Sequence, residues 1–284
     1  MAPSMTASRE NVARRPAGRP GRLLPVWLHA AVLAGCAVIG LAVVVRSTIH
    51  SVTGFSLDQR MMDSLGVTLH GWSQIMDVLG LVTDAGVAIA LLACVVVALV
   101  RRRWAVAAAV GVLVTGANVT TQVLKYQVLH SVTRQNSLPS GHTTVGLSLA
   151  LAAVVVASYR WRPLVTTGAA GLATFVGAGT VASHWHRPGD VLAAAMVCLG
   201  WSAVALAIAG GLQRRPPARR RGPLLGLASV LGVAFAGVVF VVIGVRPSFG
   251  VHGLPLATFT LGLLGAMFAV VVGWVSAAVD RWVG

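Results

Sequence analysis

The stretch LLPVWLHAAVLAGCAVIGLAVVV, residues 23–45, contains no aspartate, glutamate, lysine or arginine. A helix needs about 20 such residues to cross the roughly 30 Å hydrocarbon layer of a bilayer. The run is long enough for this, and it lacks the small-residue cleavage site that ends a signal peptide. It therefore predicts a retained transmembrane helix, and similar apolar runs recur along the chain.

The composition of the whole chain points the same way. Of 284 residues, 56% are hydrophobic and only 10% are charged, whereas a soluble domain has about 25% charged residues. The polar side chains are too few to cover a water-facing surface. The formal net charge is +15, but the arginines stand in short clusters between apolar runs, which is how membrane proteins encode their orientation. We therefore expect no nucleic-acid partner.

Eight apolar runs of spanning length predict an all-α, polytopic membrane fold. They begin near Leu24, Asp84, Val106, Thr143, Leu164, Asp190, Leu224 and Ala257. If the N-terminus is cytoplasmic, 16 of the 22 lysine and arginine residues fall in inner segments. The other six fall in outer segments: Arg46, Arg60, Lys125, Arg134, Arg187 and Arg246. This asymmetry predicts eight crossings with both termini in the cytoplasm.

A basic stretch, QRRPPARRRG at residues 213–222, divides the chain. We expect a six-span core before it and a two-helix addition after it. The addition has almost no ionisable residue, which indicates a role in packing or oligomerisation. The predicted units are a basic cytoplasmic tail (1–24), the six-span core (25–212), a basic cytoplasmic linker (213–223) and a C-terminal transmembrane hairpin (224–284).

The segment between the first two runs, residues 47–83, is long and mixed in polarity. Residues 55–69 favour an interfacial helix with Met61, Met62, Leu65 and Val67 toward lipid. Four of the chain's seven acids are expected on the outer side: Asp58, Asp63, Asp77 and Asp190. A two-metal hydrolase needs several convergent carboxylates, so we expect no metal and no cofactor.

The first stretch that contains candidate catalytic and binding residues is KYQVLHSVTRQNSLPSGH, residues 125–142. Its Pro-Ser-Gly end closes a loop and opens a helix, and free N–H groups at a helix start bind anions. Lys125, the only lysine, and Arg134 add positive charge beside that start. We expect Lys125, Arg134, Ser140 and Gly141 to bind a phosphate that His142 reaches from the first turn.

The second stretch is SHWHRPGD, residues 183–190, at the outer mouth of a predicted span. Pro188 suits the first turn of a helix. His186 and Asp190 are four residues apart and share a face if that turn is helical. A carboxylate in this place holds one imidazole nitrogen and raises the basicity of the other, which is the arrangement of a nucleophile with its helper.

Together these stretches resemble the phosphatidic acid phosphatase type 2 family, the lipid phosphatases related to vanadium haloperoxidases. Residues 139–142 match its Pro-Ser-Gly-His element, and His186 with Asp190 match the end of its last element. The resemblance covers residues 25–212 and implies that His186 attacks phosphorus, that Asp190 steadies its ring, and that His142 protonates the leaving oxygen. It implies a lipid substrate such as phosphatidate, phosphatidylglycerophosphate or a polyprenyl diphosphate.

The chain also departs from the family pattern. Lys125 and Arg134 are nine residues apart rather than seven, and Gly179 and Thr180 stand where the family has Ser-Arg. A missing charge-assisted contact to the transition state costs about 2–4 kcal/mol. A weak or inactive member that acts as a membrane scaffold or lipid-binding protein is therefore the alternative. Arg187 or His184 could supply the missing charge.

Two further readings stay open at this stage. His130, His142, His184 and His186 could form a zinc site, and Asp84 within a span could indicate a transporter. The arginine-rich, lysine-poor composition is typical of a GC-rich bacterial genome. We therefore expect a multi-pass plasma-membrane protein whose site faces the extracytoplasmic side, and the sequence leaves its oligomeric state open.

Overall fold

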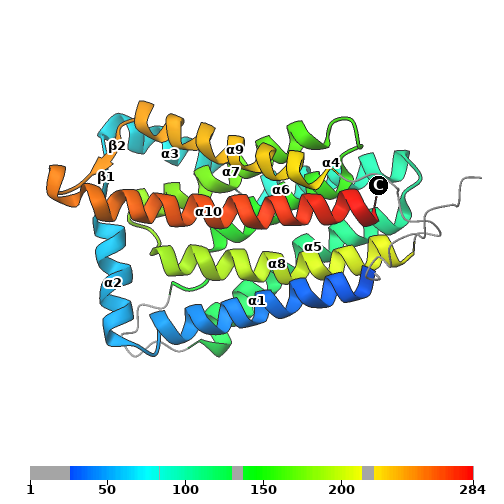
Figure 1. Cartoon of the computed structure of the whole chain (residues 1–284), viewed down its shortest axis with the longest axis horizontal. Coiled ribbons are helices and arrows are strands. Elements are labelled where there is room, and N and C mark those ends of the chain that lie inside the picture. Colours follow the sequence, from blue (N-terminus) through cyan, green and yellow to red (C-terminus); the bar gives the residue numbers. More distant parts are fainter. Residues whose placement is uncertain (1–25, 83, 130–136, 213–220, 284) are drawn as a thin grey trace, which may run out of the picture.

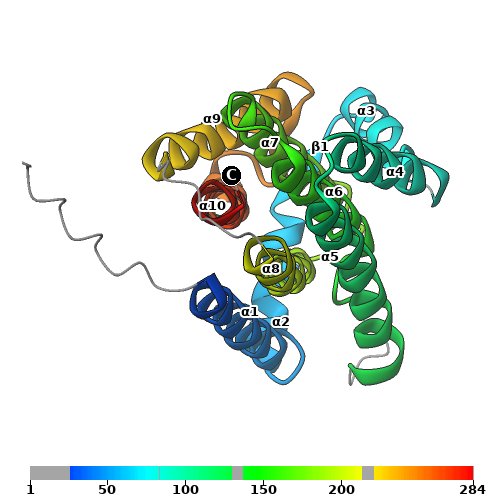
Figure 2. The same ribbon diagram turned by 90° about the vertical axis from the view of Figure 1, so that its right-hand side faces the viewer.

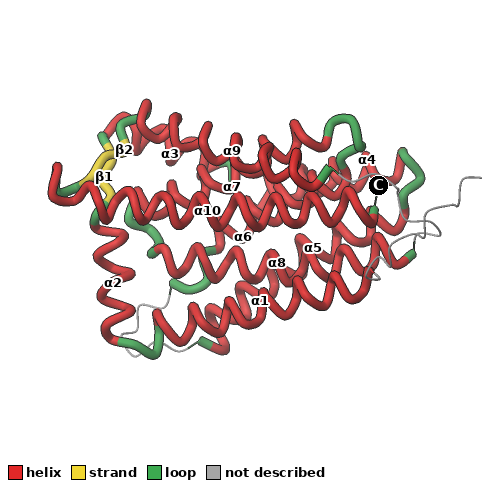
Figure 3. Tube along the Cα trace, in the orientation of Figure 1, coloured by secondary structure: helices red, strands yellow, loops and turns green. Residues whose placement is uncertain are grey.

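The computed structural model describes residues 26–82, 84–129, 137–212 and 221–283. The described chain is a bundle of helices, with one small sheet at one end (Figures 1 and 3). The elements are α1 (Val26–Thr48), α2 (Val52–Asp63), β1 (Leu65–Val67), α3 (Leu69–Gly80), α4 (Asp84–Val100), α5 (Trp104–Val123), a short π-helix (Leu124–Val128), α6 (Gly141–Val156), α7 (Arg162–Ala182), α8 (Pro188–Gly211), α9 (Gly222–Val242), β2 (Val245–Pro247) and α10 (Gly250–Trp282).

The predicted all-α membrane fold is confirmed. In the described ranges, six helices are long and apolar enough to cross a bilayer: α1, α5, α7, α8, α9 and α10. The helix α4 meets this condition only together with α3, as a bent pair, and α6 has 16 residues. Each of the eight predicted runs thus forms a helix, while the number of complete crossings remains a prediction.

The first turn of α1 and the last turn of α10 lie at the same end of the bundle (Figure 1). Gly210, near the end of α8, shows this contact directly, because a Cβ added there would lie 2.8 Å from Val26 Cγ2 and 3.3 Å from Trp282 Cβ. This arrangement agrees with termini on one side of the membrane. That this side is the cytoplasm stays a prediction from the arginines.

The helix α8 is the central element of the bundle. It packs against α1, α5, α6 and α10, and Figure 2 shows it among them in an end-on view. The C-terminal helices belong to the same core, since α9 lies along α7 and α10 contacts α7 and α8. Phe268 of α10 is fully buried against Gly177 of α7, where a Cβ would clash with its ring. Small residues allow such close approach of membrane helices.

At the other end of the bundle, α2 lies across the helices instead of along them (Figure 1). After it, β1 pairs antiparallel with β2, with Gly66 opposite Arg246. The predicted interfacial helix over residues 55–69 is therefore too long, because the helix ends at Asp63 and the chain then turns into β1. Met61 and Leu65 are buried and do not face lipid, since pairing with the α9–α10 connection turns this segment inward.

Candidate active site

The two sequence stretches meet where α6 and α8 begin, at the end of the bundle that α2 crosses. The backbone N–H of Ser140 donates to the carbonyl oxygen of Asp190 over 3.0 Å. This bond joins the residue that precedes α6 to the first turn of α8. Residues 50 positions apart in the sequence are thus fixed side by side.

The start of α6 has the form of an anion site. Ser140 is its cap: the fully buried hydroxyl accepts from the N–H of Thr143, 3.4 Å away, and from the Thr143 hydroxyl, 3.0 Å away. A Cβ built on Gly141 meets nothing within 4 Å. Within the described part of the chain, the backbone N–H groups of Gly141 and His142 donate no hydrogen bond. These N–H groups and the helix dipole can therefore receive an anion.

His186 and Asp190 form the predicted pair. The Nδ1 atom of His186 lies 3.2 Å from Oδ2 of Asp190, and both side chains are buried. His186 itself precedes α8, so the contact is not made along a regular helix. Instead, Asp190 in the first turn reaches back and also accepts the backbone N–H of Arg187, over 3.0 Å. This is the way an acidic residue at N3 caps a helix start.

Two further side chains join this pair, and sequence reasoning did not assign them there. The hydroxyl of Ser137 donates to Oδ2 of Asp190, and the Arg187 guanidinium donates to Ser137 Oγ over 3.1 Å. Asp58 of α2 accepts the N–H of Gly189 over 2.8 Å. The only sequence signal for Ser137 was its place just before the Pro-Ser-Gly element, and none linked Asp58 to α8.

Asp58 has an unusual environment for a carboxylate. Burial raises its pKa to about 6, and the negative charge of Asp190 also raises it, whereas the Gly189 N–H and the Arg187 guanidinium act in the opposite direction. The guanidinium is close but not in tight contact, with Arg187 Nε 3.9 Å from Asp58 Oδ2. The carboxylate is therefore held at the site in spite of its desolvation.

His142 completes the described site from the first turn of α6. Its ring lies 5.3 Å, centroid to centroid, from the ring of Trp185. Lys125 is close enough for its charge to act on this imidazole. Lys125 comes from the π-helix that follows α5. Arg134, the other predicted phosphate ligand, lies outside the described residues, as does His130.

The position of the missing family arginine is closed by packing. Thr180 is fully buried, its hydroxyl donates to the carbonyl oxygen of Gly177, and its own carbonyl oxygen accepts the N–H groups of Trp185 and His186. A Cβ on the neighbouring Gly179 would lie 3.3 Å from Ile75 Cγ2 of α3. The backbone at Thr180 thus shapes the turn that carries His186, and its side chain faces the protein interior.

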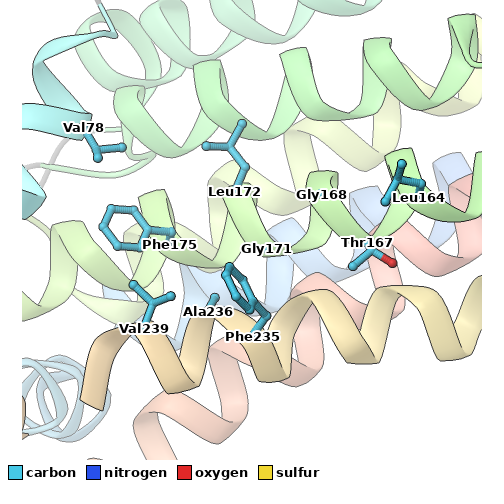
Figure 4. A pocket seen from close by; sticks show the side chains of 10 residues that line it. All are labelled: Val78, Leu164, Thr167, Gly168, Gly171, Leu172, Phe175, Phe235, Ala236 and Val239. Carbon is cyan, nitrogen blue, oxygen red and sulfur yellow. The ribbon is translucent and has the colours of Figure 1, made fainter. Parts of the chain in front are cut away.

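Other parts of the described structure offer less chemistry. Among the described residues, no three His, Cys, Asp or Glu side chains gather as metal ligands, and the side chain of Asp84 is not described. A cavity of about 640 Å³ lies between α7 and α9, with Val78 of α3 at one end (Figure 4). Its lining is apolar apart from Thr167 and includes no residue of the site helices α5, α6 and α8.

Comparison with known families gives the same assignment as the motifs. The model of the PAP2 superfamily matches residues 83–214, from the start of α4 past the end of α8. Residues 83–214 are therefore a segment of the phosphatidic acid phosphatase type 2 family, a family of phosphatases, in a chain with apolar spanning helices. The matched segment excludes α1 to α3 and the α9–α10 hairpin. Comparisons with curated proteins and with solved structures gave no match.

Proposed function

We propose that this protein is a metal-independent lipid phosphate phosphatase that works through a phosphohistidine at His186. The observation that carries the proposal is the His186–Asp190 contact beside the α6 start. Because Asp190 holds Nδ1 of the ring, Nε2 is the nitrogen left to attack phosphorus. An oriented and polarised imidazole of this kind is an activated nucleophile.

The reaction has two steps. In the first, Nε2 of His186 forms a bond to phosphorus, the bond from phosphorus to the lipid oxygen breaks, and His142 gives that oxygen its proton. In the second, His142 takes a proton from water, the resulting hydroxide attacks phosphorus, and the P–N bond breaks to release phosphate. Lys125, Arg134 and the N–H groups of Gly141 and His142 hold the phosphate oxygens in both steps.

The substrate class follows from where the site lies. His142 and His186 stand at helix starts at one end of a membrane bundle, so a phosphate headgroup can enter while its tails remain in lipid. We propose phosphatidate, phosphatidylglycerophosphate or a polyprenyl diphosphate as the substrate, hydrolysed at the extracytoplasmic face of the plasma membrane. The side is inferred from the arginine asymmetry.

One observation favours a second candidate, a family member that binds lipid without hydrolysing it. The buried Thr180 leaves the site without the family arginine. Against this, His142, His186 and Asp190 are all present, and a site that had lost catalysis would have no reason to keep all three. The enzyme is therefore the stronger proposal.

The test is phosphate release by the purified protein in detergent with EDTA, on each of the three lipids. His186→Asn is compared with His184→Asn, a matched control because His184 is exposed and has φ +60°, a conformation that asparagine tolerates. We expect release that survives EDTA, disappears in His186→Asn and persists in His184→Asn. Trapping of ³²P on the wild type in acid-labile form would identify the phosphohistidine. Folded protein that releases phosphate from none of the lipids would instead support the binding protein.

A further inference from the structure

The transverse helix α2 closes tightly on the first turn of α8. Gly189 shows how close the contact is, because a Cβ there would lie 2.6 Å from Thr48 Cγ2 and 2.7 Å from Asp58 Oδ2. No larger residue fits this position without displacing α2 or the end of α1. Both of these helices lie outside the segment that matches the family.

Residues of α2 hold both neighbours of Pro188. Asp58, which is 6% exposed, accepts the Gly189 N–H at Oδ1 over 2.8 Å. Its Oδ2 faces Arg187 Nε at 3.9 Å, and the Arg187 guanidinium carbon lies 4.4 Å from the centroid of the Phe55 ring. The backbone and the side chain of the α8 start are thus both anchored on α2.

The same anchor leads directly to the catalytic pair. Arg187 donates its guanidinium N–H to Ser137 Oγ and its backbone N–H to Asp190 Oδ2. Ser137 in turn donates to that Oδ2, the oxygen that faces His186. All these contacts lie on the Asp190 side of the imidazole, and none of them needs a substrate.

We propose that Asp58 is a positioning residue, which fixes the first turn of α8 through Gly189 and Arg187 and thereby sets the orientation of Asp190 and His186. The inference rests on the proposed function for its catalytic meaning. It assigns to α2, a helix outside the family segment, the task of aligning the family's catalytic pair.

The pKa of Asp58 distinguishes a positioning role from a purely structural one, because the ionised carboxylate costs stability instead of adding it. Its pKa is about 6 in the folded protein, above the ordinary value of 3.8, with burial as the main cause. An acid with a raised folded pKa binds more protons when folded, so stability falls as pH rises from 3.8 to about 6 and stays lower above that range. The charged groups that act on Asp58 are Asp190 and Arg187. The α1 and α10 residues around it, Val44, Ser47, Thr48 and Leu263, carry no charge.

The experiment compares Asp58→Asn with Asp63→Asn, the same change on the same helix, where the carboxylate contacts Gln59 instead of α8. In Asp58→Asn we expect kcat to fall about tenfold with KM within about twofold, because a misaligned site loses transition-state stabilisation and not substrate binding. We expect Tm at pH 7 to rise, and the rise to shrink as the pH is lowered toward 5. Asp63→Asn should leave kcat unchanged.

Loss of Tm with an unchanged kcat for the folded protein would overturn the proposal, as would full activity in Asp58→Asn. If the wild type hydrolyses no lipid, the proposed function fails. The effect of Asp58 on the position of His186 is then tested by a measurement that does not need turnover. In that case His186 is carbethoxylated with diethyl pyrocarbonate and measured by peptide mass spectrometry against the exposed His70 and His252. A change of about twofold or more in this ratio in Asp58→Asn is expected for a displaced imidazole. An unchanged ratio overturns the inference.

Discussion

Two buried aspartates at opposite ends of the bundle have different surroundings. At the end of the bundle where α10 finishes, Asp280 of α10 binds Arg162 of α7 over 2.9 Å, and its other oxygen accepts the N–H of Arg221. Arg162 is fully buried and also donates to the Ala157 carbonyl oxygen. At the end that α2 crosses, Asp190 faces an imidazole, a hydroxyl and a backbone N–H.

The difference distinguishes a structural ion pair, Arg162–Asp280, from the candidate catalytic pair, His186–Asp190. The Arg162–Asp280 pair joins two helices that are far apart in sequence, and a guanidinium does not lose its proton. At the other end, Asp190 accepts from Ser137 and from the Arg187 N–H with the same oxygen that contacts Nδ1 of His186. The same residue type therefore joins two helices at one end of the bundle and, in the proposed mechanism, orients a nucleophile at the other.

The largest expected effect comes from Asp190. Asp190→Asn should lower kcat by about 10³–10⁴-fold, because the amide favours the wrong imidazole tautomer, as when the aspartate of a serine-protease triad is replaced. The folded protein should keep a Tm close to the wild type. Phosphate release and thermal unfolding in detergent measure the two quantities. Activity within a factor of about ten of the wild type would show that His186 does not depend on Asp190.

The same change at Asp280 should lower stability and leave kcat unchanged. Asp280→Asn leaves Arg162 buried without a counter-charge and should cost about 3–5 kcal/mol of stability, while kcat per folded molecule is retained. The double variant Arg162→Met with Asp280→Leu is the control, and it should recover most of the loss, because apolar residues replace the ion pair without a buried charge. An equal loss in the double variant would contradict a charge-based explanation.

The smallest effect is expected for Arg187, and its size tests whether this residue supports Asp190 or binds the phosphate. Its contacts include Ser137, Asp58 and Phe55, so Arg187→Gln should lower kcat about tenfold with little change in KM. A phosphate ligand would behave differently, because its loss costs about 10²–10³-fold. Steady-state kinetics on the lipid that the wild type hydrolyses best distinguish the two, and the larger loss would make Arg187 the substitute for the missing family arginine.

The helices were predictable because each depends mainly on its own sequence. The run at residues 23–45 became α1, and Pro188 opens α8 as expected. The contact between His186 and Asp190 agrees with the four-residue spacing, but it is made from a residue before α8 to the first turn of α8 and not along a regular helix. The extent of the helix over residues 55–69 was not predictable, because strand pairing with residues 245–247 ends it early. That pairing partner lies about 180 positions away in the sequence.

Within the site, the residues that the sequence failed to place are those with long-range contacts. Ser137 lies 53 residues from Asp190, and Asp58 lies 131 residues from Gly189. Thr180 was noted as a departure from the family, but only the packing of α3 over Gly179 shows that this position is closed to a phosphate. No local pattern records which loop residue faces which helix start.

The sequence by itself determined the membrane class, the order of the helices, the two motifs and the pairing of His186 with Asp190, because hydrophobic length and short-range spacing act within single segments. Only the tertiary structure decided that α2 crosses the end of the bundle where α8 begins, that Asp58 contacts Gly189 and Ser137 contacts Asp190, and that Arg162 meets Asp280. These contacts exist because packed helices bring distant residues within hydrogen-bond distance, and the free energy of that packing is summed over the whole bundle.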